Sequence, residues 1–240
     1  MSKTLNHFIY DRCIVEKISF PMLPVFAAEH YAQCAEDIII ASILCALAMK
    51  NNIDLGKERF LEIGGNHPIS TSATFLLEQR FGMTGVIVEA NPELLDDLCS
   101  IRSRNLILHA AITDQQTSSV KLSIADVNEL SSIDRNFLPH YQDGKIGERA
   151  YIDVPALRIN QLFENEFPKK SPIYMSIDIE GMDLKVLQDL DFERFRPTII
   201  QIEPSDHYLP ENSRFMFEFM KTKNYDLIGR TDVNLIFSEA

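Results

Sequence analysis

The sequence predicts an α/β protein built on a mostly parallel β-sheet with helices on both faces. Short apolar runs typical of buried strands alternate with segments of helical periodicity, which is the pattern of repeated strand–helix–strand units. Four of these runs end in or beside a carboxylate, and they cover residues 59–63, 85–89, 173–178 and 198–203. The chain closes on two strands at 225–229 and 233–238, and the short turn between them predicts an antiparallel hairpin.

The composition is ordinary for a globular protein and unfavourable for nucleic-acid binding. Of the 240 residues, 45% are hydrophobic and 24% are charged, and the formal net charge is −12. Because a nucleic-acid backbone is bound by clustered Lys and Arg, we expect no nucleic-acid partner. The cysteines lack CxxC or zinc spacing, so we expect free thiols at Cys13, Cys34, Cys45 and Cys99.

The location expected from the sequence is cytoplasmic. No basic-then-apolar leader opens the chain, so we expect no secretory signal peptide. The longest apolar run, residues 38–49, is too short to span a bilayer, and we therefore expect no membrane span.

We expect a single domain over residues 1–240, with residues 1–57 as an N-terminal helical extension. Pro21 and Pro24 interrupt residues 1–30, and the first clear helix covers 35–50. The elements expected next are a strand at 58–63, a helix at 70–80 that stops near Gly82, a strand at 85–89, a helix from Pro92 to about 100 and a strand at 106–111.

The segment 113–160 interrupts the alternation of strands and helices. Residues 120–124 and 150–155 alternate like half-exposed strands, and the polar segment 125–149 lies between them. A long connection inside a compact domain is usually functional, so we interpret 125–149 as a lid or acceptor-binding insertion. From residue 173 the alternation resumes with strands at 173–178 and 197–203 and helices at 182–190 and 211–222.

The four carboxylates favour a cationic ligand over a dinucleotide. Carboxyl ends of parallel strands form the ligand crevice in such sheets, so Glu62, Glu89, Asp178 and Glu203 are expected to surround one pocket. The turn 64–68 lacks the G-x-G-x-x-G spacing that binds a pyrophosphate. S-adenosylmethionine has no phosphate, and its ribose diol, ammonium and sulfonium all favour nearby carboxylates.

Several motifs give the chain a family resemblance over roughly residues 30–238. It resembles the FkbM-type family of S-adenosylmethionine-dependent methyltransferases in the segments 31–37, 60–68, 85–92 and 176–183, of which the last is the most specific. Glu62 stands where the family usually has aspartate, Gly65 replaces alanine, and Ala32 and Ala35 replace the commoner serine and glycine. The resemblance implies a Rossmann-like class I methyltransferase fold with a seven-stranded sheet.

The resemblance also implies which residues hold the cofactor. Those implied at the methionine end are Glu62, Gly64, Gly65 and Asn66, with Asp178 facing the ammonium and methyl region. Those implied at the nucleoside are Glu89 at the ribose, Ala90 and Asn91 beside the adenosine, and Ala110 and Ala111 near the adenine. From the residues alone, Gly64 and Gly65 also fit a tight structural turn. Asp178 or Glu180 also fits an N-cap before the helix 182–190.

Transfer to an aliphatic hydroxyl needs a general base, because such a hydroxyl barely ionises at neutral pH. The candidate bases are Asp178, Glu180, His67 and His207. We expect no metal, although Asp178 and Glu180 together with Glu203 or Asp206 form an alternative set of oxygen ligands for a divalent cation.

The function predicted is S-adenosylmethionine-dependent methyl transfer, with O-methylation of a sugar, glycan or secondary metabolite suggested by the resemblance. The partner is then a small-molecule or glycan acceptor, for which Arg135, His140, Tyr141 and Arg149 could supply hydrogen bonds, and homo-oligomerisation stays open. The alternatives are an NAD-dependent Rossmann-fold oxidoreductase and a non-catalytic nucleotide-binding module.

Overall fold

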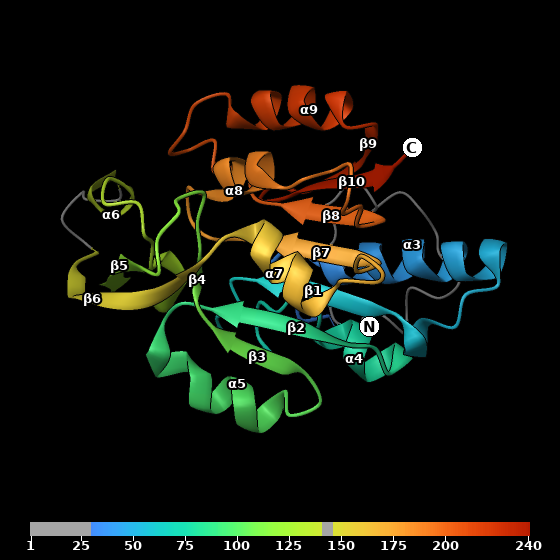
Figure 1. Ribbon diagram of the computed structural model, residues 1–240, viewed down its shortest axis with the longest axis horizontal. Coiled ribbons are helices and arrows are strands. Elements are labelled where there is room, and N and C mark those ends of the chain that lie inside the picture. Colours follow the sequence, from blue (N-terminus) through green and yellow to red (C-terminus); the bar gives the residue numbers. More distant parts are fainter. Residues whose placement is uncertain (1–29, 141–145) are drawn as a thin grey trace, which may run out of the picture.

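The computed structural model describes residues 30–140 and 146–240, and its centre is a seven-stranded β-sheet (Figure 1). The strands, in their order across the sheet, are β3 Leu106–His109, β2 Thr84–Glu89, β1 Arg59–Ile63, β7 Tyr174–Ile177, β8 Ile199–Ile202, β10 Leu235–Glu239 and β9 Tyr225–Arg230. Neighbours from β3 to β8 pair in parallel, whereas β10 is antiparallel to both β8 and β9. The predicted sheet and its C-terminal hairpin are confirmed.

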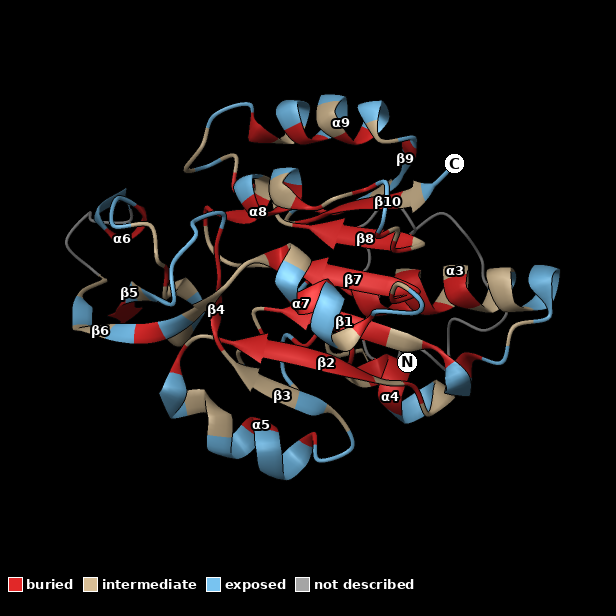
Figure 2. Ribbon diagram, in the orientation of Figure 1, coloured by how far each residue is buried: buried red, intermediate tan, exposed pale blue. Residues whose placement is uncertain are grey.

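Helices cover both faces of the sheet, as predicted. The helices are α3 Glu36–Asn51, α4 Phe75–Phe81, α5 Leu95–Ile101, α6 Phe137–His140, α7 Ile159–Glu166, α8 Asp183–Asp189 and α9 Asn212–Thr222. Helices α3, α4 and α5 share one core with Phe60 and Ile87, and α7, α8 and α9 share the other with Leu61 and Val86. Since successive strand residues point to opposite faces, the central strands are buried on both sides (Figure 2).

The chain reverses its direction of travel across the sheet between β1 and β7. From β1 it moves outward to β2 and β3, and it later continues on the other side of β1 with β7 and β8. The register places Ile63 opposite both Val88 and Ile177, so that the three carboxyl ends lie level. In open α/β sheets a crevice forms at this switch point, which is where the site described below lies.

A second, three-stranded sheet extends beyond the carboxyl ends of the main strands (Figure 1). Its strands are β4 Ala111–Ile112, β6 Glu148–Leu157 and β5 Ser119–Ala125. The expected strands at 120–124 and 150–155 are therefore present. The expected single strand at 106–111 is wrong, because the chain leaves the main sheet after His109 and joins β6 from Ala111 onward. The interpretation of 125–149 as an acceptor insertion stays a prediction, as does the single-domain assignment.

Two helical expectations need correction. Helix α4 begins at Phe75 and not near residue 70, because residues 72–74 form a turn around the Glu62 carboxylate. Helix α7 was not predicted, although Ile159, Leu162 and Phe163 follow helical spacing and are fully buried. The short 3₁₀ helices are η2 Leu55–Lys57, η3 Pro92–Leu94 and η4 Asn128–Leu130.

The remaining expectations concern the N-terminal segment, the cysteines and membrane-spanning helices. The irregular stretch 1–30 lies, apart from its last residue, outside the described residues, as does Cys13. Cys45 and Cys99 are free thiols, and Cys34 is buried. Within the described ranges, no helix has the length and apolar composition needed to cross a membrane.

Candidate active site

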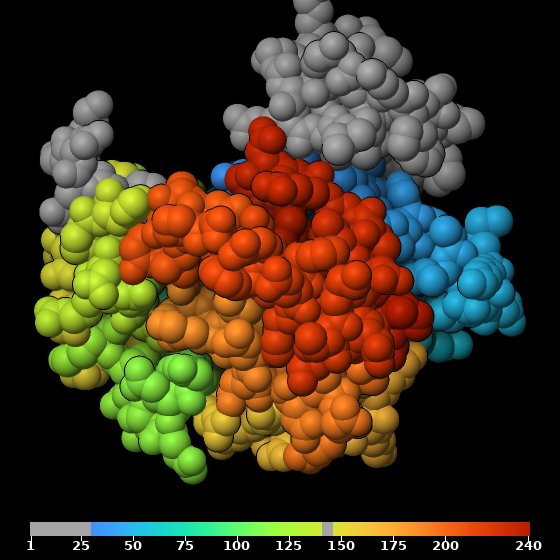
Figure 3. Space-filling model, turned by 90° about the horizontal axis from the view of Figure 1, so that it is seen from above, coloured from blue at the N-terminus to red at the C-terminus, as the bar shows by residue number. Residues whose placement is uncertain are grey.

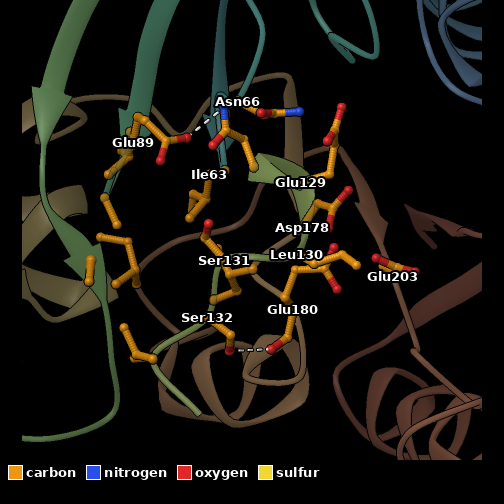
Figure 4. Close-up of a pocket in the computed structure, with 18 of the residues that line it drawn as sticks. Ile63, Asn66, Glu89, Glu129, Leu130, Ser131, Ser132, Asp178, Glu180 and Glu203 are labelled. Atoms are coloured by element: carbon orange, nitrogen blue, oxygen red, sulfur yellow. Dashed lines mark hydrogen bonds between the residues drawn. The ribbon is translucent and has the colours of Figure 1, made fainter. Parts of the chain in front are cut away.

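A cavity of about 480 Å³ opens at the carboxyl ends of the parallel strands (Figure 4). One side is formed by residues that follow β1 and β2, including Gly64, Asn66 and Glu89. The opposite side is formed by Asp178 and Glu180 after β7 and by Glu203 after β8. The segment 128–133, which contains η4 and follows β5 of the second sheet, also lines the cavity. The cavity thus lies where two sheets and the switch point meet.

The glycine turn after β1 lets the backbone approach the cavity closely. Gly64 has φ +90°, and a Cβ on it would lie 1.8 Å from the Asp178 carbonyl oxygen. A Cβ on Gly65 would lie 2.5 Å from Cγ2 of Ile87. The amides of both glycines donate to the Val88 carbonyl oxygen, at 3.0 and 3.1 Å. The turn is therefore structurally required, and only Gly64 also lines the cavity.

Glu89, at the end of β2, is fixed by two backbone amides. Its Oε2 accepts from the Asn66 amide at 2.8 Å, and its Oε1 accepts from the Asn91 amide at 2.6 Å. The residue is 8% exposed, and burial raises the pKa of its carboxyl while these donors oppose the rise. The amides of Ala90 and Gly65 also lower the pKa of this carboxyl, so four backbone N–H groups surround it.

Three carboxylates gather on the opposite side of the cavity. One oxygen each of Asp178, Glu180 and Glu203 lies within 4.8 Å of the others. Burial raises the pKa of Asp178 and, together with repulsion from Asp178, the pKa values of Glu180 and Glu203. The hydrogen bond between Glu203 and Asp178 lowers the pKa of Asp178 and raises the pKa of Glu203, so Glu203 takes up a proton before Asp178 does.

The same oxygens form a set that a divalent cation could bind, since hard cations prefer carboxylate ligands. The geometry is therefore compatible with the alternative ligand set of Asp178, Glu180 and Glu203 for a divalent cation. Asp206 points elsewhere, because its Oδ1 accepts from the Ser213 amide at 2.7 Å.

The turn that carries Asp178 and Glu180 is held by a buried carboxyl. Strand β7 ends at Ile177, and Glu180 and Gly181 have φ values of 54° and 92°. The two carboxylates therefore meet through a turn that follows the strand. The Asp183 oxygens accept from the amides of Ile179 and Gly181 at 3.1 and 3.2 Å. Neither Asp178 nor Glu180 caps α8, whose N-cap is Met182.

Stability is expected to fall as the pH rises through the range in which Asp183 ionises. Burial and the nearby Asp178 raise the pKa of Asp183 to about 8, whereas an unfolded aspartate titrates near 4. The folded state then binds more protons than the unfolded state between about pH 4 and 8, so its free energy of unfolding decreases with pH by up to about 1.4 kcal/mol per unit. Urea unfolding of wild type and Asp183→Asn from pH 5 to 8 should show a shallower slope in the variant. Equal slopes would contradict this role.

Most, though not all, of the predicted site residues line the cavity. Those that do are Gly64, Asn66, Glu89, Ala90, Ala110, Ala111, Asp178, Glu180 and His207. Those that the structure places outside the lining are Glu62, Gly65, Asn91 and His67.

Each of these outlying polar side chains has a local partner. Glu62 is 3% exposed and accepts from the Ala73 amide and the Thr74 hydroxyl, on the α4 side of the sheet. His67 is exposed, and its Nδ1 accepts from the amides of Ile69 and Ser70. Asn91 caps η3 by accepting from the Glu93 amide.

His207 lies at the exposed mouth of the cavity, beside the ring of His140 at 6.2 Å between centroids. Burial and His140 lower the pKa of His207. Of the residues suggested for acceptor binding, Arg149 pairs with Glu93 at 2.6 Å and Arg135 stacks on Tyr151 at 4.3 Å. Tyr141 lies outside the described residues.

Sequence reasoning missed some lining residues. They are Gln33, Thr71, Val233 and the run 128–133. The run belongs to the predicted insertion, but nothing in its composition marks it as nearer to the site than its neighbours.

The strand order, the switch-point cavity and its carboxylates together define a Rossmann-like class I methyltransferase fold. The model of the FkbM methyltransferase domain matches residues 62–227, which is more than half of the chain. The chain therefore belongs to the FkbM methyltransferase family. No curated protein matches the sequence.

Solved structures agree with this fold at low sequence identity. A Staphylococcus aureus protein described as a caffeoyl-CoA O-methyltransferase is 10% identical with a TM-score of 0.50, over 98% of this chain and 99% of that one. A Bacillus cereus O-methyltransferase in complex with S-adenosylhomocysteine is 14% identical with a TM-score of 0.47, over 98% and 96% of the two chains. At such identities the likeness to the former supports the fold alone.

Proposed function

We propose that the protein transfers a methyl group from S-adenosylmethionine to a hydroxyl of an uncharged or cationic small molecule or glycan. The observation that carries this proposal is a cavity with one fixed carboxylate, Glu89, on the strand-β2 side and three carboxylates on the β7 and β8 side. S-adenosylmethionine has a diol that suits the first and cationic groups that suit the others.

The residues of the cavity fit this cofactor. Glu89 lines the cavity, where its carboxylate can accept from the ribose hydroxyls in addition to the amides of Asn66 and Asn91. Ala90, Ala110 and Ala111 leave space for a planar base beside Glu89. Asp178 lies against the Gly64 turn, where it can face the ammonium. When bound, the cofactor supplies an electrophilic methyl group on its sulfonium.

Asp178 is the group best placed to accept the acceptor's proton. Asp178 lines the cavity, and its hydrogen bond with Glu203 lowers the pKa of Asp178 while it raises the pKa of Glu203, which favours the charged form of Asp178 over that of Glu203. Glu180, Glu129 and Leu130, which also line the cavity, then limit where an acceptor can lie. Positioning the hydroxyl in line with the methyl group supplies much of the rate in such transfers.

The charge of the cavity restricts the class of acceptor. Its acidic lining residues are Glu89, Glu129, Asp178, Glu180 and Glu203, and none of the described residues that line it is Lys or Arg. A phosphate, carboxylate or acyl-CoA acceptor would find no lysine or arginine to pair with here, whereas a neutral sugar or an aminated compound needs none. The pyrophosphate of NAD would lack a lysine or arginine partner in the same way, so the oxidoreductase alternative is disfavoured.

Calorimetry with S-adenosylmethionine, S-adenosylhomocysteine and NAD tests the cofactor. We expect micromolar binding of both sulfur ligands and no binding of NAD, for the charge reason given above. If neither sulfur ligand binds, with or without Mg²⁺, the proposal is refuted. Tight binding of NAD would support the oxidoreductase alternative.

Acceptors are then screened by methyl transfer from labelled S-adenosylmethionine to matched sugars in free, amino and phosphorylated forms. Turnover confined to the phosphorylated form would refute the charge argument. Cofactor binding without turnover on any hydroxylated compound would favour the non-catalytic alternative.

A further inference from the structure

A fully buried arginine outside the cavity holds the loop that borders it. Arg102, which follows α5, is 0% exposed. Its Nη1 donates to the Pro68 carbonyl oxygen at 3.2 Å and to the Ser72 hydroxyl at 3.0 Å. Its Nη2 donates to the Thr74 hydroxyl at 2.8 Å. One guanidinium thus contacts the loop 64–74 at three points.

Two carboxylates complete this arrangement. Arg102 Nε donates to Glu78 at 2.7 Å, and its Nη1 lies 3.7 Å from a Glu62 oxygen. Glu62 also accepts from the Ala73 amide at 2.8 Å and from the Thr74 hydroxyl at 2.5 Å. We call Arg102, Glu62 and Glu78 the loop clamp. The charges of the clamp are paired, as buried charges must be.

The loop has a conformation that requires such support. Asn66 and Thr71 are not glycines, yet their φ values are 38° and 63°. Conformations of this kind persist only where surrounding contacts over-determine them. Both residues line the cavity, and the Asn66 amide donates to Glu89. The loop clamp therefore supports, from outside the cavity, a loop whose residues Asn66 and Thr71 line the cavity.

We propose that Arg102 is a positioning residue for cofactor binding, which it supports by fixing the loop 64–74 from behind. The inference rests on the proposed function, because it assigns the cofactor to the cavity that this loop borders. Lysine cannot replace Arg102, since an ammonium lacks the planar fork that reaches Pro68, Ser72 and Thr74 together.

The test compares Arg102→Lys with the milder Thr74→Val, which removes one hydroxyl that both Arg102 and Glu62 contact. The matched control is Arg59→Lys at the opposite end of β1, where the guanidinium donates to the Glu166 carbonyl and stacks on Phe167. Calorimetry gives the Kd of S-adenosylhomocysteine, hydrogen exchange follows the Asn66 amide, and the melting temperature is recorded for each variant.

We expect Arg102→Lys and Thr74→Val to raise the Kd by ~10-fold or more and to expose the Asn66 amide to exchange. Arg59→Lys should leave the Kd and the exchange of the Asn66 amide unchanged, even if its melting temperature falls as much as that of Arg102→Lys. The inference would be overturned if Arg102→Lys and Thr74→Val both kept wild-type affinity and a protected Asn66 amide. It would also be overturned if Arg59→Lys lost as much affinity as they do. If wild type binds neither sulfur ligand, the proposed function fails, and the exchange of Asn66 still decides whether the clamp holds the loop.

Discussion

Replacing Asp178 by asparagine is expected to lower kcat by ~10²–10⁴-fold, which is the usual contribution of a general base. Asparagine keeps the size of the side chain but cannot accept the proton of an acceptor hydroxyl. The KM for the acceptor should change much less than kcat, because the proton moves only in the transition state. Steady-state kinetics with an acceptor found in the screen measure both values.

Glu203→Gln is the informative comparison for Asp178→Asn. The glutamine amide can still donate a hydrogen bond to Asp178, as the carboxyl of Glu203 does. We therefore expect kcat to fall by no more than ~10-fold. If the glutamine variant loses as much activity as Asp178→Asn, the base is not Asp178 alone. If Asp178→Asn retains wild-type kcat, the proton is accepted elsewhere, and Glu180 and His207 are the remaining predicted bases that line the cavity.

Replacing Glu89 by alanine is expected to weaken binding of S-adenosylmethionine by ~10²-fold. The change removes two charge-assisted hydrogen bonds to the ribose, each worth about 1.5–3 kcal/mol before compensation by water. Because the ribose is common to both ligands, S-adenosylhomocysteine should lose the same factor. Calorimetry with the two ligands measures the ratio.

Two controls separate this effect from a general loss of structure. Glu89→Ala also leaves the buried amides of Asn66 and Asn91 without their acceptor, so a lower melting temperature is expected. Glu89→Gln keeps one acceptor oxygen and should have an intermediate Kd. Asp178→Asn removes the charge that faces both the ammonium and the methyl region, so it should weaken S-adenosylmethionine more than S-adenosylhomocysteine, which keeps the ammonium but has no sulfonium. Unchanged affinity in Glu89→Ala would exclude Glu89 from the cofactor site.

Glu62 and Glu89 show how far the sequence could predict the site. Both follow apolar strand patterns, and both were expected to face the cofactor. Glu89 is the last residue of β2 and reaches the cavity. Glu62 is followed by one more strand residue, Ile63, and its side chain points to the α4 side of the sheet. Strand alternation allowed either face for Glu62, and its partner Arg102, forty positions away in the chain, settled the choice.

Asp178, Glu180 and Glu203 illustrate the second limit. Their positions after two apolar runs predicted the correct edge of the sheet. Their mutual distances depend on the turn with positive φ at Glu180 and Gly181 and on the parallel pairing of β7 with β8. Neither feature has a local sequence signal strong enough to place carboxylate oxygens within 4.8 Å of one another.

Local patterns in the sequence predict the order of most strands and helices, the carboxyl-end location of the site and most of its acidic residues. They can do so because apolar periodicity records which segments are buried, and parallel strands bring their ends to one edge. Tertiary structure alone decided which carboxylates face the cavity, where the chain leaves the main sheet at Ala110, and how Arg102 holds the loop 64–74. These features depend on contacts between residues far apart in the chain, and local patterns do not encode such contacts.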